Sequence, residues 1–529
     1  MTETKAPKQD EAKRAGRGGL AVLAAKVFFI VTGLVQQALL PRFISQADYG
    51  ALSRVLAVSN VLNNVVVSSS TQGVSRTVAA AGAHSSEALR ATLRVHGVVT
   101  LIFVALLALS APFVAHFQQA PEVLSPLLVM TGVLAVYGVY APLVGYLNGR
   151  GMFTKQAALD MIAATLRTLG LLGLGWLFVK NAGALAASLG TSPGVLGAAV
   201  GAVLAATGVF SVALRWAGTG KGWTGARPAG VPAARAYVSL IVPVMVAQLF
   251  TNGLMQADIF LLGRYLSLAA QNANLADASK ASNEWVGAYR AAQLFAFLPY
   301  QLLFSVTQVL FPMLARARAE EGESRVAELV ARGSRIGAII CGMLVAVVLA
   351  MPESLIKFAY GANIAKQGAP ALHVLALGQT CFAMFGLATT VLVSLGRERV
   401  AMAMTAMALG LLATVCFVVI PGADFGAPQL ISAATATTVA LAVALVVSAA
   451  TVKRVARAFV PLKTALRVGL CVALAFFAGS HMPVFSKLVT PVAAVMVVLA
   501  YFVVLVVTGE LGKDDLSLVA SIAMRRAKR

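Results

Sequence analysis

Carboxamide side chains recur inside a long apolar stretch of the sequence, residues 242–266. Gln248, Asn252 and Gln256 follow one another in steps of four. At about 100° per residue, this spacing places them along one stripe of a helix. Each amide both donates and accepts hydrogen bonds, so the stripe can bind a ligand rich in hydroxyl groups. Because polar groups are costly in lipid, their alignment predicts a water-filled path inside the protein.

A second stripe is predicted on the next apolar stretch, residues 286–312. Arg290, Gln301 and Gln308 fall within about 20° of one another on a helix. The arginine adds a fixed positive charge to a set of amides, which is the chemistry that binds an anion. Two polar stripes on successive spanning helices therefore predict one cavity that both helices line.

The first two apolar stretches carry comparable groups. In residues 49–76, Arg54, Asn60 and Asn64 lie within an arc of about 120°, and a stripe of this length favours a water-filled cavity over isolated contacts between helices. Lys26, in the stretch before it, has two interpretations. It is either a lysine whose ammonium group reaches the membrane surface or a cation that faces the cavity.

Three further charged residues lie inside apolar stretches. Asp160 and Arg167 are seven residues apart and share a helix face, so an ion pair with a structural purpose and a role in coupling or substrate binding are both open. Asp258 either neutralises Arg54 or Arg290, or binds a coupling proton or sodium ion. The chain thus predicts possible ion coupling or gating at Asp258 and Arg167.

The elements that position these residues are membrane-spanning helices. Of the 529 residues 59% are hydrophobic and 12% charged, and apolar runs of about 20 residues recur throughout. The fold class is therefore an all-α polytopic membrane protein. We predict fourteen spans, at residues 19–41, 49–76, 95–115, 124–147, 157–179, 194–214, 237–264, 286–313, 334–351, 369–395, 400–420, 428–450, 468–482 and 488–508.

The net charge of +22 raises the question of nucleic acid binding. Lys and Arg recur on alternate predicted loops, however, which is the pattern of cytoplasmic loops in membrane proteins. It predicts that both termini are cytoplasmic and that nucleic acid is no partner. The four cysteines all lie in predicted spans without metal-ligand spacing, so we predict no metal site and assign them to the apolar core.

A tandem repeat is suggested by short matches in the same order. The matching pairs are 40–43 with 262–265, Gly50 to Arg54 with Gly287 to Arg290, and 149–150 with 396–397. Six spans return the chain to its starting side, so the two copies are parallel. The predicted parts are a disordered cytoplasmic tail (1–18), an N-terminal six-helix bundle (19–215), a cytoplasmic linker (216–236), a C-terminal six-helix bundle (237–450), two additional helices (451–508) and a cytoplasmic tail (509–529).

Catalysis is not predicted. The longest external loop, 267–285, has no histidine and only Asp277 and Glu284 as acids, whereas a membrane glycosyl polymerase or ligase needs a catalytic constellation. The five histidines are scattered, and no nucleotide-binding motif occurs. The chain is therefore predicted to be no enzyme and to need no cofactor beyond a possible proton or sodium gradient.

Three stretches carry a resemblance to a known family. They are ALLPRFISQADYGALSRVLAVSN (38–60), residues 286–316, which begin VGAYRAAQLFAFLPYQ, and residues 370–421, which begin PALHVLALGQTCFAMFG. With them the chain resembles the polysaccharide (oligosaccharide-lipid) flippases of the multidrug/oligosaccharidyl-lipid/polysaccharide (MOP) exporter superfamily. The resemblance implies two six-helix bundles in a V, with spans one, two, seven and eight lining the cavity.

The same resemblance implies a function. Polyprenyl-diphosphate-linked oligosaccharides would be flipped across a bacterial inner membrane, with polysaccharide polymerase and chain-length proteins as possible partners and the protein itself a monomer. Lys26 would meet the diphosphate from the cytoplasm, and Arg54 and Arg290 would meet or gate it on the other side. A peptidoglycan-precursor flippase remains an alternative. A multidrug exporter is another, although the excess of cations over acids inside the spans favours an anionic substrate.

Overall fold

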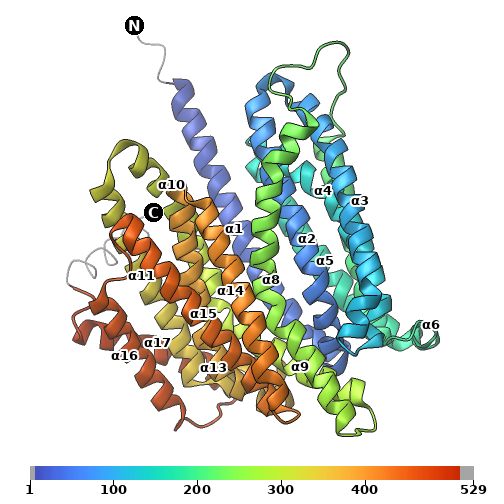
Figure 1. Ribbon diagram of the computed structural model, residues 1–529, viewed down its shortest axis with the longest axis vertical. Coiled ribbons are helices and arrows are strands. Elements are labelled where there is room, and N and C mark those ends of the chain that lie inside the picture. Colours follow the sequence, from blue (N-terminus) through green and yellow to red (C-terminus); the bar gives the residue numbers. More distant parts are fainter. Residues whose placement is uncertain (1–5, 513–529) are drawn as a thin grey trace. The chain divides into compact units, whose positions relative to one another are not determined.

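The computed structural model describes the backbone of residues 6–512 and the side chains of residues 24–512 except Ser305 and Val309. All regular elements in this described part are helices (Figure 1). The helices are α1 (Ala6–Phe43), α2 (Gln46–Ala81), η1 (Gly82–His84), α3 (Ser85–Phe117), η2 (Pro121–Val123), α4 (Leu124–Gly149), α5 (Phe153–Asn181), α6 (Gly183–Ser188), α7 (Pro193–Ala217), α8 (Ala234–Asn272), α9 (Ala278–Ala296), α10 (Leu298–Glu320), α11 (Glu323–Ala350), α12 (Pro352–Tyr360), α13 (Ala362–Ser394), α14 (Glu398–Val419), η3 (Ile420–Gly422), α15 (Ala427–Ala456), α16 (Leu462–Gly479) and α17 (Val489–Val507).

The predicted spans are present as helices. Within the described residues, 13 stretches are long and apolar enough to cross a membrane, and one of them, Gln46–Phe117, comprises both α2 and α3. The fourteen predicted spans are therefore accounted for, and the protein is an all-α multi-pass membrane protein. The eighth span differs from the expectation of one continuous helix, because α9 ends at Ala296 and α10 begins at Leu298. Proline at position 299 lacks the amide hydrogen that would continue the hydrogen-bond ladder.

The N-terminal tail also differs from expectation. Residues 6–18, predicted to be disordered, lie within α1, which begins at Ala6. Their alanine, lysine, arginine and glutamate content favours a helix, and the apolar helix that follows allows the turn to propagate. Residues 1–5 lie outside the described part of the chain, as do residues 513–529 of the predicted C-terminal tail.

The chain forms two compact units, residues 1–287 and 288–529. Helix α8 packs against α2 and belongs to the first unit, so the predicted linker, 216–236, lies inside that unit. The division of the chain into two six-helix bundles stays a prediction about its repeat.

The core of the first unit is built by α2, α3, α4, α5, α7 and α8. Val78, Leu89, Leu147, Tyr237 and Ile241 are among its fully buried side chains. Because lipid is as apolar as these side chains, close packing and hydrogen bonds hold the helices together more than withdrawal from water does.

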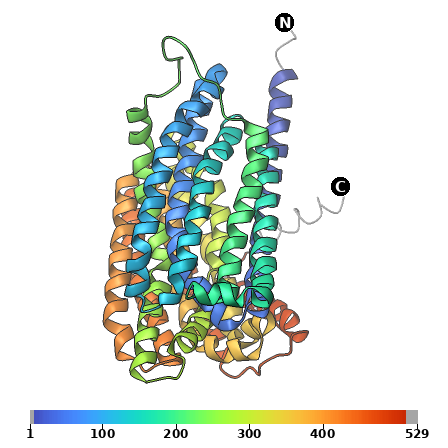
Figure 2. The same cartoon turned by 90° about the vertical axis from the view of Figure 1, so that its right-hand side faces the viewer.

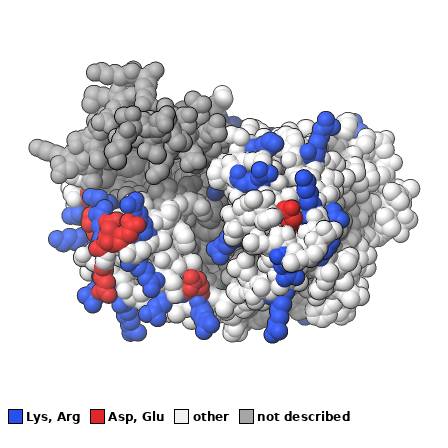
Figure 3. Space-filling view, turned by 90° about the horizontal axis from the view of Figure 1, so that it is seen from above, with Lys and Arg blue, Asp and Glu red and all other residues white. Residues whose placement is uncertain are grey.

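The linker is fixed to one end of this unit. Val231 joins the same core, and the amide of Lys221 donates to the carbonyl of Ser86 over 3.1 Å. Figure 2 shows the linker as a loop at the end where α2 finishes and α3 begins. In Figure 3, which looks at the molecule from this side, most of the visible charged side chains are Lys and Arg.

At the opposite end, α2 and α9 cross very closely. A Cβ atom built on Gly50 would overlap the carbonyl oxygen of Asn283, and one built on Gly287 would lie 2.8 Å from the carbonyl oxygen of Gln46. The contact is reciprocal. Gly50 meets the backbone of Asn283, four residues before Gly287, and Gly287 meets the backbone of Gln46, four residues before Gly50. Gly50 and Gly287 are the residues predicted to be equivalent in the repeat, and equivalent residues meet each other at a two-fold axis. The two glycines that the predicted repeat makes equivalent thus lie at one crossing, and the repeat itself stays a prediction.

The second unit is centred on α13, which packs against α10, α11 and α15. Helices α16 and α17 attach to α11 through a small apolar cluster that includes Ala346, Val468 and Tyr501. The hydroxyl of Tyr501 donates to the carbonyl of Ile339 over 2.9 Å. The four cysteines are free, and all but Cys381, which is half-buried, are fully buried, so their predicted place in the core is confirmed.

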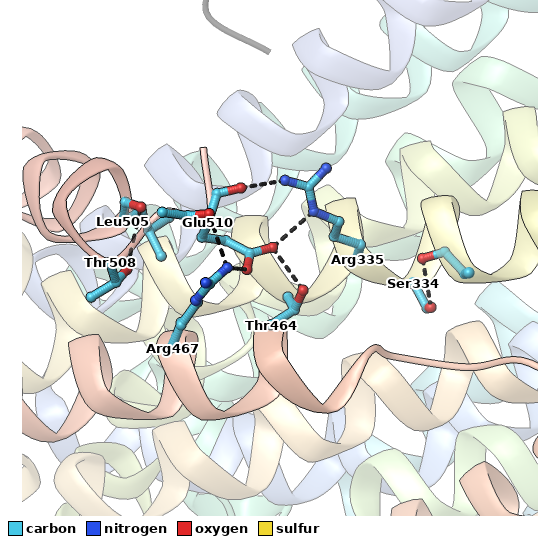
Figure 4. A network of polar contacts seen from close by, with 9 residues as sticks. Ser334, Arg335, Thr464, Arg467, Leu505, Thr508 and Glu510 are labelled. Carbon is cyan, nitrogen blue, oxygen red and sulfur yellow. Dashed lines mark hydrogen bonds and ion pairs between the residues drawn. The ribbon is translucent and has the colours of Figure 1, made fainter. Parts of the chain in front are cut away.

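A buried carboxylate just beyond the end of α17 also binds α11 and α16 (Figure 4). The side chain of Glu510 is 2% exposed, and it accepts hydrogen bonds from Arg335 Nε at 2.8 Å, Thr464 Oγ1 at 2.7 Å and Arg467 Nη1 at 3.0 Å. Burial acts to raise the pKa of Glu510, but the bonds from these three residues outweigh it and leave the pKa below its ordinary value. One ionised group thus joins α11, α16 and the segment after α17.

Candidate functional site

The predicted polar stripes of α2 and α8 meet inside the first unit. Asn64 Nδ2 donates to Asn252 Oδ1 over 2.8 Å, and Asn252 Nδ2 donates to the carbonyl and side-chain oxygens of Gln248 over 2.8 and 3.1 Å. Asn60 and Gln256 lie one turn away on their helices and are half-buried. The structure therefore brings five of the predicted residues to neighbouring faces of two packed helices, and their contact with a substrate stays a prediction.

Arg54 lies nearer the crossing of α2 with α9 and is fully buried. Its Nη1 donates to Ser267 Oγ over 2.9 Å and its Nη2 donates to Ser282 Oγ over 3.1 Å, whereas its Nε has no partner. Glu122 is the acid whose charge acts on it. The guanidinium is thus held by two neutral hydroxyl groups and makes no ion pair with a described residue.

A buried amide extends this environment. Gln118 is fully buried, and neither its Oε1 nor its Nε2 has a hydrogen-bond partner among the described residues. A Cβ atom built on Gly263 would lie 3.2 Å from Gln118 Oε1 and 3.4 Å from Arg54 Cζ, so glycine allows α8 to approach both groups. We call Arg54, Gln118, Ser267 and Ser282 the Arg54 cluster. Buried polar atoms without partners cost free energy, so the Arg54 cluster is poorly satisfied among the described residues.

Lys26 and Asp160 act on each other electrostatically within the first unit. Lys26 is exposed on α1, and its charge acts on the half-buried Asp160 of α5. Arg167, two turns further along α5, acts instead on Tyr137 of α4. The two residues of α5 that were predicted to share a face therefore have different neighbours.

Asp258 is 1% exposed, and its Oδ1 accepts a hydrogen bond from the amide of Ile259 over 2.7 Å. Because Arg54 is held by serine hydroxyls, Asp258 is not its counter-ion in this structure. The remaining alternatives for Asp258, a structural partner of Arg290 or an ion-coupling group, stay predictions.

The second unit carries the other two predicted residues. Arg290 is half-buried, and its Nη1 donates to Gln293 Oε1 over 3.0 Å. Gln301 is half-buried on α10, beyond the break at Phe297. Phe297 keeps a helical backbone conformation, its amide donates to the carbonyl of Gln293 over 2.9 Å, and the amide of Gln301 donates to the carbonyl of Phe297 over 3.1 Å. The common stripe of Arg290 and Gln301 stays a prediction.

Sequence analysis missed a buried histidine. His96, near the start of the predicted span 95–115, is fully buried between Ser70 Oγ, 2.9 Å from its Nδ1, and Tyr237 OH, 2.6 Å from its Nε2. It links α2, α3 and α8 of the first unit. The partners are 26 and 141 residues away in sequence, and no local spacing could have connected them.

Comparison with known proteins identifies the family. The family model described as "Polysaccharide biosynthesis protein" matches residues 15–318, which is more than half of the chain. No curated protein sequence matches the chain.

Several solved structures share the fold. The lipid II flippase MurJ, in an inward closed conformation, is 12% identical with a TM-score of 0.70, and the match covers 91% of this chain and 98% of that one. A multidrug resistance MATE family transporter of the MOP superfamily, in an inward-facing conformation, is 14% identical with a TM-score of 0.58, covering 83% and 99%. A MOP superfamily transporter from Pyrococcus furiosus, whose title reports a binding pocket of reverse polarity, is 13% identical with a TM-score of 0.54, covering 82% and 95%. Because the family model covers more than half of the chain, this chain belongs to the polysaccharide biosynthesis protein family, and it shares its fold with these solved transporters.

Proposed function

We propose that the protein flips polyprenyl-diphosphate-linked oligosaccharide repeat units from the cytoplasmic to the periplasmic leaflet, for a cell-surface polysaccharide such as O antigen, capsule or exopolysaccharide. Membership of the polysaccharide biosynthesis family and the MOP transporter fold support a transporter rather than an enzyme. The finer assignment depends on the chemistry of the residues described above.

The environment of Arg54 is the observation that carries the proposal. The guanidinium is fully buried, is held only by hydroxyl groups and has an unpaired Nε. These surroundings suit the reversible binding of an anion. A diphosphate accepts charge-assisted hydrogen bonds that are about twice as strong as neutral ones, so it can replace the serines. A permanent carboxylate partner would have competed with it.

Other predicted residues supply the remaining chemistry. In this proposal exposed Lys26 meets the diphosphate from the cytoplasmic side. The amides of Asn64, Asn252 and Gln248 form a chain that can exchange its internal bonds for sugar hydroxyls. The polyprenyl tail remains in lipid. Alternating access requires α2 and α9 to separate at Gly50 and Gly287 when the far end opens.

We propose a bacterial inner-membrane location with both termini in the cytoplasm. The basic face in Figure 3 supports this orientation, because cytoplasmic loops carry an excess of Lys and Arg. Proton or sodium coupling through Asp258, with Arg167 as a further candidate, belongs to the same proposal. Its test is the rate of flipping by Asp258→Asn before and after the ion gradients are collapsed. If Asp258 couples transport to an ion, the flipping rate of the parent should fall when the gradients are collapsed, and the rate of Asp258→Asn should not change.

A second candidate is a peptidoglycan-precursor flippase. The match to the lipid II flippase covers 91% of this chain, against 83% for the MATE transporter, which favours a lipid-linked substrate over a soluble drug. Both lipid substrates carry a diphosphate, so the cations do not separate them. A complementation experiment separates them. If this chain restores growth to cells depleted of their own lipid II flippase, the second candidate is established.

The primary proposal is tested by flipping of a lipid-linked oligosaccharide in vesicles containing purified protein. Lys26→Ala and Arg290→Ala are each expected to reduce the rate at least tenfold, because each removes a cation from the path of the diphosphate. Lys463→Ala and Arg399→Ala, which change exposed side chains of the same types, serve as matched controls. Full activity in both Lys26→Ala and Arg290→Ala would show that the assignment is wrong.

A further inference from the structure

A polar pocket lies in the first unit at the end opposite the linker. Its walls are the start of α2, η2, the turn between α6 and α7, and the start of α9. The cavity measures about 420 Å³, which lies within the range of about 300–1,000 Å³ found for small-molecule sites. We call it the η2 pocket.

The charge of the η2 pocket is negative. Asp48, Glu122 and Asp277 line it, and Lys280 is the one basic residue in its lining. The backbone amide of Lys280 donates to Asp277 Oδ1 over 2.9 Å. The balance of three acids and one base selects a ligand with positive charge.

A buried acceptor without a partner points in the same direction. Asn283 is 3% exposed, and its Nδ2 donates to Glu122 Oε1 over 2.8 Å, while its Oδ1 has no partner. Because a carboxylate only accepts hydrogen bonds, it fixes the nitrogen of this amide toward Glu122 and leaves the oxygen for another donor. Thr191 Oγ1, also in the lining, is a second buried atom without a partner. The pocket therefore offers unsatisfied acceptors beside carboxylates.

The size and chemistry of the lining exclude several ligands. No group of three His, Cys, Asp or Glu side chains among the described residues is close enough together to hold a metal ion. The lining contains no aromatic ring on which a neutral sugar could stack. A donor-rich organic cation satisfies both the charge and the free acceptors.

We propose that the η2 pocket binds a protonated amine, carried either by an amino sugar of a translocated glycan or by a free small polyamine. The ammonium group lies beside Glu122 and donates to Asn283 Oδ1, while Asp48 and Asp277 add negative charge from other parts of the lining. The binding step stands on the pocket itself and is independent of the proposed function.

A ligand bound in the η2 pocket would affect the Arg54 cluster, because neighbouring residues of α9 contact both sites. Glu122 accepts hydrogen bonds from Ser279 and Asn283, and Ser282, between them, holds Arg54. The charge of Glu122 also acts on Arg54. An amine bound beside Glu122 offsets that charge, so it changes the electrostatic environment of the buried guanidinium.

Calorimetric titration of the full-length protein in nanodiscs at pH 7 tests the proposal. The probes are glucosamine, N-acetylglucosamine, putrescine and calcium. N-acetylglucosamine keeps the sugar ring but lacks the charge, so it isolates the contribution of the amine. Tighter binding of glucosamine than of putrescine assigns the amine to a glycan, and the reverse assigns it to a free polyamine. Absence of saturable amine binding, equal binding of N-acetylglucosamine, or binding of calcium alone overturns the proposal.

Two variants locate the site. Asp277→Asn changes an exposed side chain, so folding is retained, and it is expected to weaken amine binding about fivefold. Asn283→Ala removes the free acceptor and is expected to weaken binding further. Asp424→Asn, which changes an exposed aspartate outside the pocket lining, is the matched control. Unchanged affinity in Asp277→Asn would place the binding elsewhere and refute the assignment, even if Asn283→Ala fails to fold.

Discussion

Two buried charges in this protein have opposite surroundings. Arg54 is held by neutral serine hydroxyls, whereas Glu510 is held by two arginines and a threonine. A buried charge that is fully paired stabilises a fold or is neutral to it, and one that is poorly paired lowers stability. The contrast indicates a structural role for Glu510 and is consistent with the functional role that we propose for Arg54.

Replacing Arg54 by methionine tests this distinction. Ser267 Oγ and Ser282 Oγ are already 3.4 Å apart and can bond to each other once the guanidinium is gone. We expect Arg54→Met to leave stability unchanged or raise it by about 1–4 kcal/mol, because a poorly paired buried charge is removed. Flipping should fall at least tenfold. Thermal unfolding in detergent and the vesicle assay measure the two effects, and a large loss of stability would contradict the functional assignment of Arg54.

Glu510→Gln should have the opposite effect. The substitution weakens two ion pairs and is expected to lower stability by about 1–3 kcal/mol at pH 7, since the carboxylate is buried and accepts charged hydrogen bonds. The folded-state pKa of Glu510 lies below its ordinary value. Its stabilisation is therefore fully present above the unfolded pKa of about 4.3 and is lost as the pH falls through the folded pKa.

The pH dependence gives the control for Glu510→Gln. The difference in unfolding temperature between the parent and Glu510→Gln should shrink when the pH is lowered from 7 to below about 4. Asp424→Asn, which changes an exposed carboxylate for which no ion pair is found in the described part, is the control and should lower the unfolding temperature at pH 7 by less than Glu510→Gln. A difference that stays constant with pH would mean that the charge of Glu510 contributes nothing.

Polar residues were predictable by type and helical phase, but their partners were not. The stripes on α2 and α8 followed from spacing, and Asn64 does bond to Asn252. Ser267 and Ser282 are more than 200 residues from Arg54 and have no unusual composition around them. Glu510 was assigned to a tail, because nothing local shows that Arg335, 175 residues earlier, lies beside it. Partners set by tertiary packing lie beyond a periodicity argument.

At the level of helices, the crossing of α2 with α9 is the closest approach that bears on gating. Gly50 and Gly287 have no side chains to separate the two backbones, and Gln46 Nε2 donates to the carbonyl of Glu284 over 2.9 Å at the same place. Small residues at crossings allow close packing in membranes. In the alternating-access cycle that we propose, this close crossing would close one end of the protein without a charged pair.

Gly50→Ala should open this crossing. The added methyl group would overlap the carbonyl of Asn283, a backbone atom that cannot move aside by a rotamer change. We expect a loss of about 1–3 kcal/mol in the closed state, as for other overpacked sites. Gly33→Ala is the matched control, because a Cβ there meets nothing within 4 Å. Equal unfolding temperatures for Gly50→Ala and Gly33→Ala would show that the crossing is not tightly packed.

Helix positions were more predictable than helix continuity. All fourteen apolar spans appear, since runs of about 20 apolar residues have few other stable forms in a membrane. The break at Phe297 and the helical start of α1 at Ala6 were missed. In the first case a proline was treated as tolerated within one span, and in the second polar composition was taken for disorder. Neither feature changes the hydrophobic pattern on which the spans were based.

At the scale of the molecule, the repeat and the compact units describe different properties. The reciprocal contact of Gly50 with Gly287 agrees with two equivalent halves, yet α8, from the second half of the repeat, packs in the first compact unit. A transporter that rocks two halves needs contacts that cross between repeats in one state and are released in another. The packing of α8 against α2 joins the two predicted copies in this structure, and its release during transport stays a prediction.

Orientation in the membrane is the prediction on which the direction of transport depends. The linker carries Lys221, Arg227 and Arg235, and the turn between α8 and α9 at the other end carries few charges. The linker should therefore be cytoplasmic and the turn external. In a variant with its four native cysteines replaced by alanine, Ala273→Cys should react with a membrane-impermeant maleimide in intact cells. Gly222→Cys, on the linker, should react only after permeabilisation. The cysteine-free parent should react neither in intact cells nor in permeabilised cells. Reaction of Gly222→Cys alone in intact cells would reverse the orientation, and the arginines of the α2–α9 end would then meet the substrate first instead of last.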